Sequence, residues 1–376
     1  MNEKTNNESG FARFIGKIIE WYRKNKYIVN TVLILILGFL VLLAIATSFF
    51  RSPVGNHYDP TALSIGDFHI QWYAIFIMYG IACSVVLGRY ELVKKNIDVS
   101  ILYDGLLLCV PVAIVGCRLY YVFANWSDGW TFLEILGWNG STFELSGLAI
   151  QGGMLAVAAV LIPFCKFKKI SYGLIIDIAL PAFLIGQTIG RWGNFMNAEL
   201  YGPVIKSQGL LNILPNFITD QLWISEVDRY GVLQEGFRHP TFLYEGMLNM
   251  VGFIVIAVIR RKKITLVGEL GAMYLIWYGI VRGALIEPLR YFGGSPGDSM
   301  LTSSGFPMNV LLSIFMVIGG ILVIVAIRVY SRYKKKLPYY VDVKEVRKVK
   351  RVKSELADGT NEELTTGDDN DKDNTV

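Results

Sequence analysis

The chain has 376 residues, of which 53% are hydrophobic and only 18% are charged, and its mean hydropathy is +0.43. A soluble domain usually carries about 25% charged residues, so this composition argues against an ordinary soluble protein and predicts a membrane protein with several spans. The net charge of +5 says little by itself. We expect no nucleic-acid partner.

The cysteine and histidine content argues against a metal site. The four cysteines, Cys83, Cys109, Cys117 and Cys165, all lie in apolar segments, and the chain has only three histidines. We therefore expect buried free thiols rather than disulfides, and neither a metal nor another cofactor.

The chain begins with a polar, basic stretch, residues 1–27, followed by an apolar run at 28–50. The run could be a cleaved signal, because Ala44-Ile45-Ala46 resembles a small-x-small cleavage site. However, the run exceeds the roughly 7–15 residues of a signal core. It is long enough to span a bilayer of about 30 Å, which favours an uncleaved additional transmembrane helix.

Seven further apolar segments follow, each close to the ~20 residues that a spanning helix needs. They cover residues 70–90, 101–124, 147–165, 172–190, 241–259, 268–289 and 308–328. The expected fold is an all-α polytopic membrane protein with about eight transmembrane helices.

Lys and Arg gather at alternate ends of these segments. One set of ends carries the basic residues at 24–26, 94–95, 166–169, 260–263 and 334–336, whereas the other ends are nearly free of lysine. By the positive-inside rule both termini are expected in the cytoplasm. The charged tail, residues 329–376, is expected to be disordered, and its basic first half is suited to an anionic lipid surface.

One polar stretch, Gly190 to Gly202, follows the apolar segment that ends near residue 190. It holds Arg191, Asn194, Asn197 and Glu199 within nine residues, and its glycines could let the backbone turn and expose N–H groups. An arginine beside free backbone donors at a helix end would suit an anion, above all a phosphate. The simpler alternative is a loop anchored at the membrane surface by Arg191 and Trp192.

The same stretch fits the pattern Gly-Arg-x-Gly-Asn-Phe-x-Asn-x-Glu-x-x-Gly, and so resembles the bacterial prolipoprotein diacylglyceryl transferases. The resemblance runs from about Tyr73 to about Arg328. It implies a seven-helix transferase domain at 70–328, with an outer loop or head at 203–240. It also implies that the first helix and the charged tail are additions.

The family's activity is the first step of lipoprotein maturation. The resemblance implies transfer of a diacylglyceryl group from phosphatidylglycerol to the lipobox cysteine thiol of a prolipoprotein, forming a thioether and releasing glycerol phosphate. The expected partners are phosphatidylglycerol, prolipoprotein lipobox signal peptides and the lipid bilayer. The expected location is the bacterial cell membrane, with the active site toward the outer leaflet.

A second charged group, Arg282, Glu287 and Arg290, lies in the apolar segment 268–289 and just after it. In an ideal helix Glu287 and Arg290 are about 60° apart, but Arg282 and Glu287 are about 140° apart. The family's usual pattern is Arg-x-x-x-Glu-x-x-Arg, so this chain has one extra residue. A π-bulge would bring Arg282 back toward Glu287. The alternative is that the arginine and the glutamate only neutralise each other so that the helix can insert into the membrane. Because a buried charge without a function is costly, we favour a functional role.

The remaining site residues follow from shorter matches. Tyr73 and Tyr244 match family tyrosines, and Arg118 lies in a second family motif. An aromatic belt is the alternative for Tyr73, and snorkelling is the alternative for Arg118. Glu245 is as suited to a structural role as to a role in the site. Two further acidic residues inside spans, Asp104 and Asp177, are expected to hold helices together.

The expected roles divide into two sets. The catalytic set is Arg191, Arg282, Tyr244 and Glu287. The set that binds phosphatidylglycerol is Arg191, Asn194, Asn197, Glu199, Gly202, Arg118, Arg290, Tyr73 and Gln151.

Gln151 is a departure from the family, which usually has His-Gly-Gly where this chain has Gln151-Gly152-Gly153. That histidine has been proposed as a catalytic base, and Gln cannot be one. Either no base is needed at this position, or another group serves, or this member is impaired. Two rival functions therefore remain: a transporter or flippase for an anionic lipid, and a catalytically impaired lipid-binding homologue.

Overall fold

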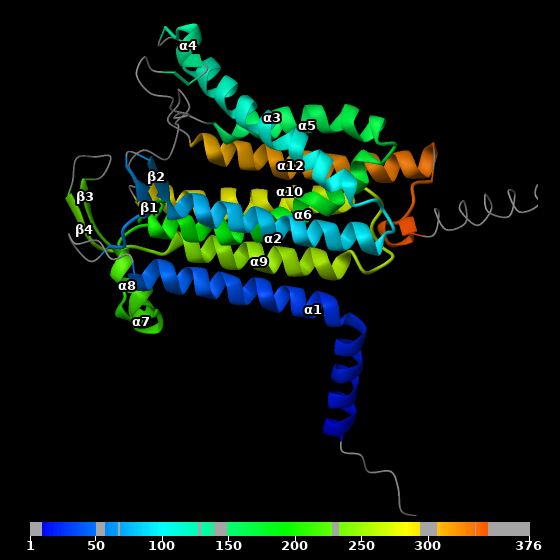
Figure 1. Cartoon of the computed structure of the whole chain (residues 1–376), viewed down its shortest axis with the longest axis horizontal. Helices are drawn as coiled ribbons and strands as arrows, with labels where there is room; N and C mark the ends of the chain where they lie inside the picture. Colours follow the sequence, from blue (N-terminus) through cyan, green and yellow to red (C-terminus); the bar gives the residue numbers. More distant parts are fainter. Residues whose placement is uncertain are drawn as a thin grey trace, which may run out of the picture. The chain divides into compact units, whose positions relative to one another are not determined.

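The computed structural model describes residues 10–49, 57–66, 68–126, 129–135, 137–138, 149–227, 233–293, 307–334 and 336–344 (Figure 1). Apart from two small hairpins, the regular secondary structure of these residues is helical, as predicted. Seven helices are long and apolar enough to cross a membrane; the eighth predicted span is a shorter apolar helix, α5 (Ile150–Phe167). The chain divides into two compact units.

The first unit takes in the N-terminal helix α1 (Gly10–Phe49), the hairpin of β1 (Thr61–Ile65) and β2 (Phe68–Gln71), and the first part of α2 (Trp72–Lys94). It also holds the end of α6 (Tyr172–Met196), α7 (Gln208–Ile213), α8 (Asn216–Leu222), the start of α9 (Thr241–Ile259) and most of α11 (Glu287–Gly293). Its second antiparallel hairpin joins β3 (Trp223–Val227) to β4 (Leu233–Phe237).

Aromatic side chains pack α1 against the end of α6. The Phe39 ring lies 5.7 Å from the Trp192 ring and 6.1 Å from the Phe76 ring, and the Tyr79 hydroxyl donates to the Leu35 carbonyl at 2.6 Å. The additional helix therefore contacts the stretch that carries the signature pattern.

The buried amide of Gln221 joins the 203–240 region to α6. Its Nε2 donates to the carbonyls of Phe195 and Met196 at 2.9 and 3.0 Å, and its Oε1 accepts from the Tyr58 N–H at 2.8 Å. Because the last carbonyls of a helix have no intrahelical donor, this side chain satisfies two of them.

The second unit contains α3 (Ser100–Ala124), α4 (Phe132–Ile135), α5, α10 (Glu269–Ile280), the π-helix η2 (Val281–Ile286), α12 (Met308–Tyr333) and the 3-10 helix η3 (Tyr340–Lys344). Figure 1 shows α3 and α5 side by side. A Cβ on Gly116 would lie 2.7 Å from the Gly152 carbonyl, and one on Gly153 would lie 2.6 Å from the Cys117 Sγ. The two glycines after Gln151 thus allow close helix packing.

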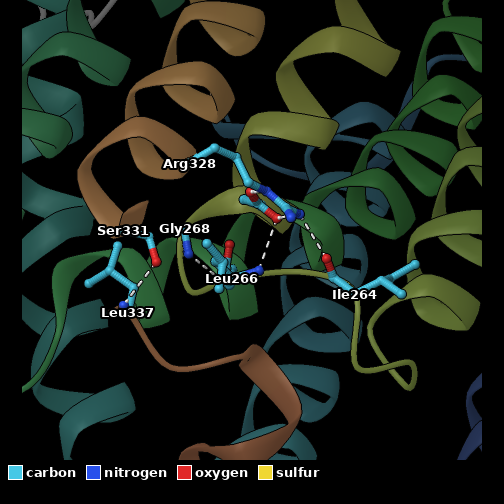
Figure 2. Close-up of polar contacts among 8 residues, drawn as sticks. Ile264, Leu266, Gly268, Arg328, Ser331 and Leu337 are labelled. Atoms are coloured by element: carbon cyan, nitrogen blue, oxygen red, sulfur yellow. Dashed lines mark hydrogen bonds and ion pairs between the residues drawn. The ribbon is translucent and has the colours of Figure 1, made fainter. Parts of the chain in front are cut away.

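Buried polar contacts fix the end of this unit where α6 and α10 begin. Asp177 accepts the N–H groups of Gly268 and Gly271 at 2.6 and 2.9 Å, which caps α10. Arg328 pairs with Glu269 and donates to the Ile264 carbonyl at 2.7 Å (Figure 2). Asp104 pairs with Lys168 at 2.5 Å. The expectation that Asp104 and Asp177 hold helices together is confirmed.

Residues 337–344, which we call the C-terminal strap, fold back onto the same end after α12. The Leu337 N–H donates to the Ser331 hydroxyl (Figure 2), and the Tyr340 N–H donates to the Thr265 carbonyl at 2.9 Å. The Tyr340 hydroxyl donates to Glu91 at 3.1 Å, and Lys95 donates to the Tyr340 carbonyl at 2.5 Å. The start of the tail expected to be disordered is therefore packed; residues 345–376 lie outside the described residues.

Candidate functional site

The signature stretch is mostly helical, which corrects the expected glycine turn and also argues against the alternative of a loop. Helix α6 continues through Arg191 to Met196, so Gly190 and Gly193 do not turn the chain. A Cβ on Gly193 would lie 2.8 Å from the Tyr73 ring, so this glycine lets Tyr73 pack closely against α6. The helix end also presents carbonyls instead of free N–H groups, so the expected anion site built from backbone donors is wrong.

The turn that follows α6 is made by residues other than glycine. Ala198 and Leu200 have φ angles of 50° and 60°, in the left-handed region. The Leu200 carbonyl accepts from the Thr241 hydroxyl, which ties the turn to α9. Gly202 donates its N–H to the His239 carbonyl at 3.0 Å, and a Cβ there would lie 2.9 Å from the His239 Cβ. Gly202 is thus required by the close approach of His239.

Arg191 is held in place by two buried acceptors. Its guanidinium pairs with Glu245 at 2.8 Å, and its Nη1 donates to Asn194 Oδ1 at 3.0 Å. Glu245 is 1% exposed and Arg191 keeps 16% of its side chain exposed. A buried carboxylate that fixes a partly exposed guanidinium leaves donor capacity for a second anion, since Arg has five N–H donors.

Glu199 extends this network through the two asparagines. Its Oε1 accepts from Asn194 Nδ2 at 2.7 Å and from Asn197 Nδ2 at 3.4 Å. Among the described residues, the buried Oδ1 of Asn197 has no hydrogen-bond partner. Tyr73 lies within electrostatic reach of both Arg191 and Glu199. The structure thus brings together five of the predicted site residues.

A small cavity opens beside this network, with about 20 Å³ accessible to the centre of a water molecule. Its lining includes Asn194, Glu199, Arg238 and His239. The imidazole Nδ1 of His239 lies 3.0 Å from the hydroxyl of Tyr244, the residue before Glu245. Burial lowers the pKa of His239 below its ordinary value. Neither His239 nor Gln221 was among the predicted site residues.

The predicted π-bulge is present in the second unit. Residues Val281–Ile286 form one turn of π-helix, and the Glu287 N–H bonds to the Arg282 carbonyl five residues earlier. This wider turn absorbs the extra residue, so the side chains of Arg282 and Glu287 form an ion pair at 2.6 Å. Glu287 is 1% exposed, so the pair is desolvated on one side. Gly283 allows the turn to approach α12, because a Cβ there would lie 2.6 Å from Ser313 Cβ.

Arg118 contacts its own loop. It donates to the carbonyls of Ile135 and Glu134 at the end of α4, and its guanidinium lies 5.1 Å from the Trp130 ring centre. These contacts favour a role in holding the loop after α3. Its predicted contact with phosphatidylglycerol stays a prediction.

Two other predicted binding residues have fewer described contacts. Arg290 is 4% exposed within the first unit, and Gln151 is half-buried in the first turn of α5. Their proposed lipid contacts also stay predictions.

Comparison with known proteins gives one consistent result. A family model described as "Prolipoprotein diacylglyceryl transferase" matches residues 60–326. The phosphatidylglycerol–prolipoprotein diacylglyceryl transferase of Streptococcus sanguinis (strain SK36) is 41% identical over 285 residues, which is 75% of this chain and 98% of that protein. Those of Streptococcus uberis and Streptococcus pyogenes serotype M5 are 39% and 38% identical over the same shares. The family match begins after α1 and ends before the C-terminal strap.

Proposed function

This chain belongs to the prolipoprotein diacylglyceryl transferase family, and we infer that it transfers the diacylglyceryl group of phosphatidylglycerol to the cysteine thiol of a prolipoprotein. The family match spans most of the chain, and the relatives that carry this activity in their names align over 98% of their own length. It is a multispan membrane enzyme of lipoprotein biosynthesis.

The chemistry explains why arginines are suited to the site. The sulfur of the prolipoprotein cysteine attacks the terminal glyceryl carbon, a C–S bond forms, and the C–O bond to phosphate breaks. Negative charge grows on the leaving phosphate oxygen. A guanidinium aimed at that oxygen therefore stabilises the transition state more than the ground state.

We propose that Arg191 contacts the phosphate, and the family pattern implies the same role for Arg282. Each is fixed by a buried glutamate, Glu245 and Glu287 respectively, and keeps 16% of its side chain exposed. Asn197, with its unpartnered buried oxygen, is suited to a glycerol hydroxyl. Arg290, Arg118, Tyr73 and Gln151 complete the proposed binding set.

The proposed orientation places the Arg191 site toward the outer leaflet. The basic ends of α2, α5, α9 and α12 all belong to the second unit, where Arg260 pairs with Glu91 and Lys95 meets Tyr340. Basic ends on the cytoplasmic side would put both termini inside and the C-terminal end of α6 outside.

The observation that carries the assignment is the network of Arg191, Glu245, Asn194 and Glu199, in which Glu245 and Asn194 are buried. The test is to incubate the purified protein in detergent with phosphatidylglycerol and a lipobox peptide, and to weigh the peptide. We expect a diacylglyceryl mass increment. Arg191→Ala should abolish it, whereas Arg261→Ala, at an exposed arginine, should not. Full activity of Arg191→Ala would rule out the phosphate role.

The same assay separates the rival functions. A transporter or flippase would move the lipid and leave the peptide mass unchanged. An impaired homologue would bind phosphatidylglycerol without forming product, and Gln151 is the feature that favours it. Gln151→His tests this directly: a gain of several orders of magnitude would mean that the wild-type chain lacks a base it needs.

A further inference from the structure

The reaction leaves a thiol proton to be placed, and Gln151 cannot take it. The chain has three histidines, all of them described. His57 is bonded to the Trp223 carbonyl, and His69 is exposed beside Ser64. His239 is the one that lines the cavity beside Asn194 and Glu199.

His239 is joined to the Arg191 network on two sides. Its carbonyl accepts the N–H of Gly202, the last residue of the signature pattern, at 3.0 Å. Its Nδ1 lies 3.0 Å from the hydroxyl of Tyr244, and the next residue, Glu245, is the counter-ion of Arg191. A chain of contacts within one unit thus links the positions of the His239 imidazole, the Tyr244 phenol and the Arg191 guanidinium.

We propose that His239 is the proton acceptor of the transfer reaction and acts through the hydroxyl of Tyr244. This inference rests on the proposed function. As the sulfur attacks, its proton passes to the Tyr244 oxygen, and the hydroxyl proton of Tyr244 passes to His239 Nδ1. The C–S bond forms, the C–O bond to phosphate breaks with its electron pair going to the phosphate oxygen, and the imidazole becomes an imidazolium.

The surroundings of His239 suit this role. Burial lowers its pKa from the ordinary value of 6.5, so the ring is neutral near pH 7 and can accept a proton. The charged groups that line the same cavity, Glu199 and Arg238, carry opposite signs. Both His239 and Tyr244 are only half-buried, so part of each side chain is exposed.

The test compares His239→Asn with wild type in the peptide assay. The asparagine amide can occupy the Nδ1 position and keep the bond to Tyr244, but it cannot take a proton. We expect kcat to fall by about 10²–10⁴-fold, the usual contribution of general base catalysis. His69→Asn, at an exposed histidine, should leave kcat unchanged. A His239→Asn enzyme within threefold of wild type would overturn the proposal.

The pH profile separates proton transfer from a purely structural role. A thiol with a pKa of about 8.5 ionises by itself at higher pH, so the defect of His239→Asn should shrink steadily from pH 7 to pH 9.5. A defect of constant size across this range would overturn the proposal. If His239→Asn does not fold, Tyr244→Phe removes the same relay and should show the same shrinking defect.

The outcomes also keep the two proposals apart. If wild-type protein makes no product, the proposed transfer itself fails. If wild type is active, Arg191→Ala is inactive and His239→Asn is fully active, only the proton relay fails.

Discussion

At the residue scale, the network around Arg191 is directional. The amide oxygen of Asn194 accepts from Arg191 and its amide nitrogen donates to Glu199. Only one orientation of the amide satisfies both the cation and the anion. Glu245 and Glu199 therefore act on the site differently. The first neutralises Arg191 directly, and the second fixes the asparagine that positions it.

Replacing the hydrogen-bond donor of the Asn194 side chain with an acceptor should reduce activity. Asn194→Asp would place two carboxylates where Asn194 Nδ2 and Glu199 Oε1 now meet at 2.7 Å. We expect a loss of about 100-fold in kcat/KM in the peptide assay, because a partly buried hydrogen bond becomes a repulsion of about 2–3 kcal/mol.

A second change should restore the bond. In Asn194→Asp/Glu199→Gln the glutamine amide can donate to the new carboxylate, so activity should recover to within about tenfold of wild type. Glu199→Gln alone supplies the control. If the double variant is no better than Asn194→Asp, the contact with Glu199 does not govern the site.

Sequence patterns identified the polar residues of the candidate site around Arg191 but not the partners that other helices bring to them. Arg191, Asn194 and Glu199 were recognisable because several polar side chains are dense in an apolar chain. Their pairing with Glu245 and the contact of His239 with Tyr244 depend on how α6 and α9 approach each other. Sequence spacing within one segment carries no information about such an approach.

At the element scale, the π-turn η2 shows how a helix accommodates one extra residue. A six-residue π-turn keeps the Arg282–Glu287 pair that an α-helix would separate. This feature was predictable because the geometry of a helix converts spacing into direction. Sequence reasoning failed at Gly190 and Gly193, which lie within the continuous helix α6 and make no turn, and Gly193 serves the close packing of Tyr73.

Deleting Ala284 should restore the family spacing without loss of function. The residue is exposed within η2, and its removal lets the π-turn close to an α-turn that still pairs Arg282 with Glu287. We expect activity within about fivefold of wild type by peptide mass spectrometry, because only the turn changes. Inserting one alanine after Ala284 is the matched control and should inactivate the enzyme. A deletion as damaging as the insertion would show that the π-turn itself is required.

The C-terminal strap should give the protein a stability that depends on pH. Burial lowers the pKa of Lys95 from 10.5 to about 8, and Glu91 partly opposes this shift. The charged and titratable groups facing Lys95 are Glu91, Lys94, Arg260, Asp177 and Tyr340. Since the unfolded chain binds more protons than the folded one between these pKa values, the free energy of unfolding should rise as pH increases from about 8.

Thermal unfolding in detergent from pH 7.5 to pH 10 measures this effect. Burial also raises the pKa of Tyr340. This shift lowers the free energy of unfolding with rising pH, but only above the ordinary tyrosine pKa of 10. Lys95→Met should remove most of the rise, and Lys94→Met, at an exposed lysine, should retain it. Equal slopes for the two variants would contradict the role of Lys95.

At the scale of the whole molecule, the basic helix ends are consistent with one membrane orientation. The ends that carry Lys94, Lys168, Arg260 and Arg328 meet within one unit through ion pairs and the C-terminal strap. Among the described residues, hydropathy predicted seven helices that are long and apolar enough to span, because a span needs only length and apolar composition, whereas the eighth predicted span is the shorter helix α5. It did not predict that the tail returns to this end, because the strap is held by a few specific bonds.

Thiol labelling tests the orientation directly. All four native cysteines, which are free, are first replaced by alanine, and single cysteines are then introduced as Lys206→Cys and Lys263→Cys, both at exposed positions. Because Lys263 belongs to the basic set of ends and Lys206 to the other, a membrane-impermeant maleimide should label only Lys206→Cys in intact cells. Lysed cells should give labelling of both. The reverse pattern would place Arg191, which precedes Lys206 by 15 residues, on the cytoplasmic side. The proposed site could then not meet a lipobox cysteine at the outer leaflet.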